Sequence, residues 1–129
     1  MTTTDPATAT AGSGDTDRHL TLEQVDSGLA ALAPAPKSEG RVAMLVACPG
    51  AGQRVELDRA RLTVAGGMPG DRHGEPSDVQ LTAMQFATSQ LIANGQPLSL
   101  FGDNLVLDLD LSEANMPAGT RVRIGEALL

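Results

Sequence analysis

Strict alternation of apolar and polar residues over 104–112, "NLVLDLDLS", most constrains how this chain can fold. A period of two predicts a strand with one buried face and one wet face. The buried face would carry Leu105, Leu107, Leu109 and Leu111. The wet face would carry Val106, Asp108 and Asp110. The chain therefore needs a sheet with cover on one side.

Residues 121–129, "RVRIGEALL", repeat this alternation and predict a second strand with a bulge or bend at Gly125. Its inward side chains would be Val122 and Ile124, and its outward ones Arg121 and Arg123. Further strands are predicted over 41–49, 54–64 and 78–82. The strand at 54–64 could also be two short strands broken near 58–60.

Two helices are predicted beside these strands. Residues 21–33 place Leu22, Val25, Leu29 and Leu32 on one face, and Thr21 with Gln24 has the spacing of a capping box. A second helix is predicted from Thr82, with a capping box to Gln85 and a left-handed exit at Asn94-Gly95. Because strands outnumber helices and do not alternate with them, we expect a mainly β fold, a twisted sheet or partial barrel with two peripheral helices.

The length of 129 residues indicates one domain, preceded by a disordered tail over 1–17 that has no large apolar residue after Met1. With no Trp or Tyr and two Phe, the core must be aliphatic. The net charge of −7 and the lack of stacking side chains argue against nucleic-acid partners. An anionic small molecule would need a local basic group.

The chain has one cysteine, Cys48, which excludes an internal disulfide and predicts a buried, inert thiol at the end of an apolar strand. No apolar run is long enough to span a bilayer, and the N-terminus lacks the pattern of a signal peptide. We therefore expect a cytoplasmic protein without a membrane partner.

Two polar turns are candidate sites. "GGMPGDRHGEP" presents Asp71, Arg72 and His73, in which Arg72 could bind a phosphate or carboxylate and His73 could move a proton. A purely structural loop is the more common outcome for such a cluster. "LFGDN" places Asp103 and Asn104 at a tight strand entrance, where a ligand contact and an ordinary turn are equally good interpretations.

Two metal hypotheses are weaker. Asp103, Asp108 and Asp110 could hold a divalent cation, but alternate carboxylates usually form the solvated side of a strand. His73 and Glu75 have the spacing of a zinc deaminase, but no downstream cysteine pair completes that site. We predict no metal ligands.

Three segments together, "GMPGDRH", "DVQLTAMQ" and the run from Leu100 to Leu129, resemble the MOSC domain, named for the C-terminal domain of molybdenum-cofactor sulfurase. The resemblance is to a small bacterial subset and covers about 40–129. It implies a β-barrel-like fold with peripheral helices over 18–129. Its matching positions are Gly70, Asp71 and Arg72, with His73 adjoining, and then Gly102, Asp103 and Asn104. We expect these two corners to lie close together.

The resemblance implies binding of molybdenum cofactor (molybdopterin), or sulfur handling for molybdoenzymes. Pyridoxal phosphate is associated only with the sulfurase domain of larger relatives, and nothing here matches that domain. The family's characteristic cysteine lies beyond the position of Leu129, so the sequence leaves open whether the chain is an enzyme of sulfur transfer or cofactor-dependent reduction. The alternative is a truncated or non-catalytic scaffold with an interaction role. A barrel lacking its last strands would expose an edge near 120–129, a site for self-association.

Overall fold

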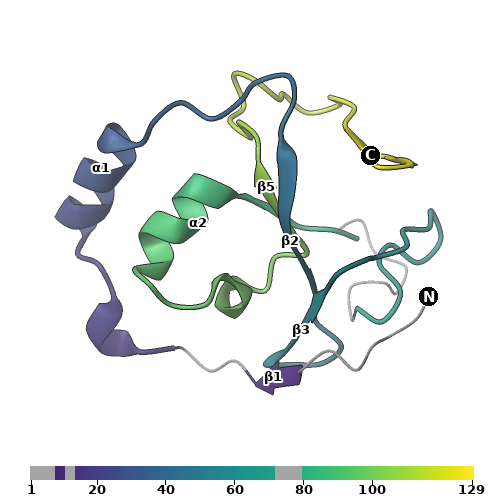
Figure 1. Cartoon of the computed structure of the whole chain (residues 1–129), viewed down its shortest axis with the longest axis horizontal. Coiled ribbons are helices and arrows are strands. Elements are labelled where there is room, and N and C mark those ends of the chain that lie inside the picture. Colours follow the sequence, from purple (N-terminus) through teal and green to yellow (C-terminus); the bar gives the residue numbers. More distant parts are fainter. Residues whose placement is uncertain (1–7, 11–13, 72–79) are drawn as a thin grey trace.

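The fold is built on a five-stranded sheet, seen in a computed structural model that describes residues 8–10, 14–71 and 80–129 (Figure 1). Neighbouring strands are antiparallel except for the parallel pair β4 and β5. In spatial order the strands are β1 (Thr8–Thr10), β3 (Gln53–Leu57), β2 (Arg41–Ala47), β5 (Leu105–Asp108) and β4 (Ala83–Gln85). The sheet therefore brings the start of β5 beside the end of β2.

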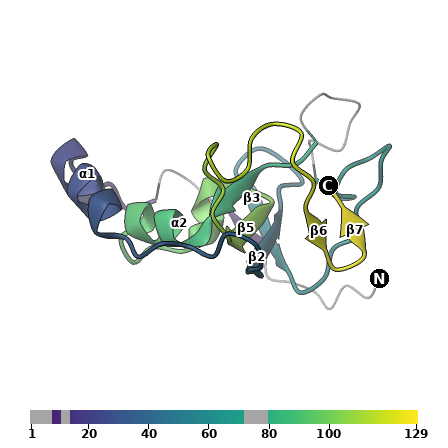
Figure 2. The same cartoon turned by 90° about the horizontal axis from the view of Figure 1, so that it is seen from above.

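Both helices lie on one side of this sheet, as Figures 1 and 2 show together. Helix α2 (Phe86–Ala93) contacts β4 and β5, and α1 (Leu22–Ala31) packs on α2, where Gly28 meets Leu91. The predicted capping box of α1 is confirmed, since Thr21 and Gln24 bond each other's backbone amides. Its predicted packing face is wrong at Leu22 and Leu29, which are 77% and 43% exposed. Instead, α1 contacts α2 closely at Gly28, which lies against the side chain of Leu91.

The C-terminal segment lies on the opposite side of the sheet as a hairpin of β6 (Arg123–Ile124) and β7 (Ala127–Leu128) (Figure 2). A single strand over 121–129 is therefore wrong. Gly125 has a positive φ of 57° and reverses the chain instead of bending it. The expected side-chain alternation holds, because Val122 is half-buried while its neighbour Arg121 is exposed.

The core on the hairpin side contains Ala47, Met68, Leu105 and Leu107, with Ile124 packed against them. The predicted wet face of β5 is wrong at Val106, which is 2% exposed. Since alternate residues of a strand face opposite sides, Val106 faces the helices, and α2 covers it. Only from Asp108 onward is that face open to water.

Three other boundaries differ from expectation. The strand over 54–64 ends at Leu57. The segment expected as a strand over 78–82 is described only from Gln80, and pairing begins at Ala83. Within the tail expected to be disordered, Thr8–Thr10 form β1 and pair with the edge of β3, so this part of the expectation is wrong.

The described residues form a mixed α and β structure in which the sheet dominates. The closed barrel is not seen in them, because β6 and β7 make a separate two-stranded sheet. No helix in this described part of the chain combines the length and apolar character needed to cross a bilayer.

Candidate functional site

The two polar corners expected to be neighbours are in contact. The Asn104 side-chain amide donates a 3.0 Å hydrogen bond to Oδ1 of Asp71, across 33 residues of sequence. Gly70 lies beside this contact in an exposed turn with a φ of 90°. Arg72 and His73, the other predicted members of the first corner, lie outside the described residues. The expected proximity of the corners is confirmed for the residues that are described.

Asn104 is fully buried, and both ends of its amide are used. Its second Nδ2 bond goes to the Val46 carbonyl at 3.0 Å, and its Oδ1 accepts from the Thr82 amide at 3.1 Å. A buried amide with its donors and acceptor satisfied stabilises a unique local packing. These bonds give Asn104 a role in holding the two corners together, and its expected ligand contact stays a prediction.

Thr82 completes this arrangement, because its Oγ1 accepts from the Asn104 backbone amide at 3.3 Å. The predicted capping box of the second helix is wrong for the same reason. Thr82 bonds Asn104, while the side chain of Gln85 accepts from the Leu111 amide at 3.1 Å. The helix then starts at Phe86 with no side-chain cap. We call Asp71, Thr82 and Asn104 the corner clamp.

Asp71 links the corner clamp to the end of β2. It is 7% exposed, and its Oδ1 also accepts from the Cys48 backbone amide at 2.6 Å. Its own amide donates to the Met68 carbonyl at 3.0 Å. One carboxylate therefore ties together the end of β2, the 68–71 turn and the entry to β5.

Cys48 lies beside the clamp and is 3% exposed, which confirms its predicted burial. Its Sγ donates to the carbonyl of Gly102 at 3.2 Å. A thiol in this position is held by the protein and turned away from water. It packs the first corner against the second.

Arg54 is a candidate residue that sequence reasoning missed. Its guanidinium lies directly against Gly102, where an added Cβ would meet three guanidinium atoms at 2.9 Å. One terminal nitrogen donates to the Gln53 carbonyl at 2.9 Å, but the buried Nε has no hydrogen-bond partner among the residues that the structure describes. Such an orphaned donor on a charged group is costly. In the sequence Arg54 is only one polar residue of a strand, and no local signal pairs it with residue 102.

Asp103 follows Gly102, the residue that Arg54 contacts, and is half-buried. Burial raises the pKa of its carboxyl, and a hydrogen bond with Thr82 partly opposes this. The second corner therefore holds a cation and an acid that takes up a proton more readily than an exposed aspartate. Arg54 and Asp103 together can bind a ligand that has a negative charge and a hydrogen-bonding edge.

Two of the aspartates considered as metal ligands pair with basic side chains instead. Asp108 pairs with Arg41 at 3.7 Å, and Asp110 pairs with Lys37 at 3.0 Å. Within the described ranges, no three acidic, histidine or cysteine side chains gather as metal ligands would.

Comparisons of the chain with protein-family models, with curated proteins and with solved structures found no match.

Proposed function

We propose that this chain is a MOSC-like scaffold that binds an anionic small molecule of the molybdenum-cofactor class at the joined corners. The observation that carries the proposal is the contact between Asp71 and Asn104. Those two positions are marked independently by the resemblance, in segments more than thirty residues apart, and packing brings them to one place. A site assembled in this way from distant loops is typical of binding sites held by a rigid scaffold.

The residues present fit such a ligand. Molybdenum cofactor carries a phosphate, and Arg54 offers a guanidinium whose Nε meets no acceptor in the described part of the chain. Asp103, whose pKa is raised by burial, offers a carboxyl group for a hydrogen-bonding edge of the ligand. When bound, the cofactor would supply redox or sulfur chemistry at its metal. The chain's own residues would bind and orient it, with the clamp holding both loops in place.

Arg72, Gly70 and His73 remain proposed contacts on the strength of the sequence alone. The barrel is likewise a proposal, supported by the way the C-terminal hairpin lies over the same sheet face as the core of Leu105 and Leu107. Self-association through the hairpin edge, where Leu128 is 54% exposed, is part of the same proposal. We also propose a cytoplasmic location.

The binding proposal is tested by titrating isolated molybdopterin into the protein and into Arg54→Gln, Arg72→Ala and Arg59→Gln. Arg59 is an exposed arginine remote in sequence from both corners and serves as the control. We expect each of the first two variants to lose about tenfold in affinity, as one lost charge-assisted bond of about 1.4 kcal/mol would give. Equal affinity for all four proteins would remove the corners from the site.

A second function, a binding or interaction scaffold without sulfur chemistry, is favoured by Cys48. Sulfur transfer needs an accessible thiolate, whereas this chain's one cysteine is buried with its Sγ on a backbone carbonyl. We expect the folded protein to react slowly with a disulfide reagent such as dithionitrobenzoate and rapidly once unfolded in urea. Fast reaction of the folded protein, with transfer of persulfide sulfur from Cys48, would favour the sulfur-handling alternative.

A further inference from the structure

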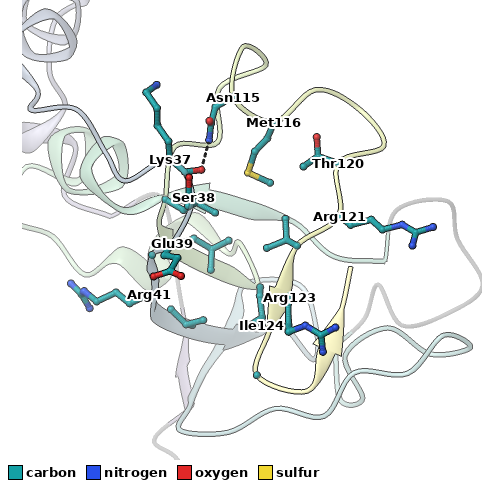
Figure 3. Close-up of a pocket in the computed structure, with 16 residues that line it drawn as sticks. Lys37, Ser38, Glu39, Arg41, Asn115, Met116, Thr120, Arg121, Arg123 and Ile124 are labelled. Carbon is teal, nitrogen blue, oxygen red and sulfur yellow. Dashed lines mark hydrogen bonds between the residues drawn. The ribbon is translucent and has the colours of Figure 1, made fainter.

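A cavity lies away from the corners, between the 37–42 segment, β5 and the C-terminal strand (Figure 3). Its volume is about 660 Å³, within the range of small-molecule sites of roughly 300–1,000 Å³. None of the clamp residues lines it. It is therefore a separate feature of the molecule, and the inference drawn from it does not depend on the proposed function.

Part of the cavity lining is apolar and part is polar. Its apolar lining comes from both the sheet and the C-terminal segment: Val42, Leu107, Leu109, Met116, Val122 and Ile124. Val42 is 37% exposed within a strand whose other end is buried, so the cavity leaves apolar surface in contact with water. An apolar group placed there would remove that surface from water.

The rim of the cavity is cationic in a protein that is otherwise acidic. Four of the nine basic residues of a chain with net charge −7 lie around it: Lys37, Arg41, Arg121 and Arg123. Figure 3 shows Lys37 and Glu39 on one wall and Arg121 and Arg123 on the C-terminal segment that forms the opposite wall, with the two guanidinium groups directed outward. This concentration of positive charge is a local field that favours anions.

Part of this charge is already neutralised. Arg41 pairs with Asp108 and also lies 5.0 Å from the ring centre of Phe86, while Lys37 pairs with Asp110. Arg121 and Arg123 have no ion pair among the described residues, and Glu39 is the one acidic residue of the lining. After these anions are set against the four cations, one positive charge is left.

We propose that this cavity binds an amphiphilic monoanion, with an apolar body against Val42, Leu107 and Ile124 and a carboxylate or similar head group at the arginine rim. The apolar lining accounts for the body of the ligand. The excess of one positive charge accounts for its single negative charge. Arg121 and Arg123 are exposed and flexible, so a change of rotamer would bring their guanidinium groups to the head group at the mouth of the cavity.

The test compares three probes by isothermal titration calorimetry at low ionic strength, below the concentration at which each forms micelles. Dodecanoate has the tail and the negative charge, dodecyltrimethylammonium has the same tail with a positive charge, and acetate has the charge without the tail. We expect dodecanoate to bind at least about tenfold more tightly than either of the others. Equal binding of the two long-chain probes, or no binding of dodecanoate, would overturn the proposal.

Paired variants locate the site. Arg121→Gln with Arg123→Gln should weaken dodecanoate binding about tenfold, because two head-group contacts are lost. The matched control is Arg59→Gln with Arg61→Gln, two exposed arginines that line a different cavity, and it should change affinity less than about twofold. Met116→Glu, which places a negative charge in the apolar lining, should abolish binding while the thermal midpoint stays near that of the wild type. Equal losses in the two arginine pairs would mean that general surface charge, and not this cavity, attracts the probe.

Discussion

Replacing Asn104 by alanine should destabilise the fold severely, because its side chain links three segments inside the core. The change removes the bonds to the Val46 carbonyl, to the Thr82 amide and to the Asp71 carboxylate. A neutral hydrogen bond contributes about 1 kcal/mol, and one to a charged group about 2 kcal/mol. The sum predicts a loss of about 4 kcal/mol, a large share of the roughly 5–15 kcal/mol of a typical domain.

The control for this change is Asn115→Ala. Asn115 also donates from Nδ2 to two backbone carbonyls, those of Lys37 and Asp110, at 3.0 and 2.8 Å. It is half-exposed, so water can replace the lost amide, and we expect a loss of about 1 kcal/mol.

Urea unfolding followed by far-ultraviolet circular dichroism measures both variants, since the chain has no Trp or Tyr to report by fluorescence. The variant Asn104→Asp adds a second check. It keeps the acceptor that faces Thr82 but turns the donor that faces Asp71 into a second acceptor, so it should be no more stable than Asn104→Ala at pH 7. If Asn104→Ala costs no more than Asn115→Ala, the clamp does not hold the corners.

Three further predictions concern other elements. Gly102→Ala should cost about 2 kcal/mol in urea unfolding, because residue 102 has a φ of 78° and an added Cβ would crowd Arg54. Hydrogen bonds from Ser112 lower the pKa of Asp110 from 3.8 to about 2. A carboxyl whose pKa is lower in the folded state than in the unfolded state stabilises the fold above the unfolded-state pKa. That stabilisation is lost as the pH falls through the folded-state pKa. Asp110→Asn should therefore flatten the decline of stability with acid between about pH 4 and 2. Thr21→Ala should remove the cap of α1 at a cost of about 1 kcal/mol, seen as roughly fivefold faster amide exchange in its first turn.

Local signals in the sequence predicted local structure well. The capping box at Thr21 and the left-handed exit at Asn94, with a φ of 48°, both form as expected. Each depends on residues within one helical turn, so tertiary packing has little opportunity to override it.

The second capping box failed because its residues are needed elsewhere. Thr82 and Gln85 have the same spacing as the box at Thr21, but each bonds a residue more than twenty positions away. The period-two pattern likewise gave a wrong prediction for Val106. Alternation shows which residues of a strand are polar, but it does not show which face of the sheet a helix covers. These errors come from long-range contacts that a short window cannot contain.

The site was partly predictable for related reasons. Glycine, aspartate and asparagine at two turns indicated polar corners, and their proximity was expected only through the resemblance. Arg54 could not be found from sequence, because its role depends on the packing of β3 against residue 102. The burial of Asn104 was missed for the same reason.

The most direct test of the central claim, that Asp71 and Asn104 join the two corners, is a double-mutant cycle with Asp71→Ala and Asn104→Ala measured by urea unfolding. Because the two side chains share one buried hydrogen bond, the double variant should lose less stability than the sum of the two single-variant losses, by a coupling energy of about 1.5 kcal/mol or more. Losses that add within about 0.3 kcal/mol would contradict the contact, and with it the joined site.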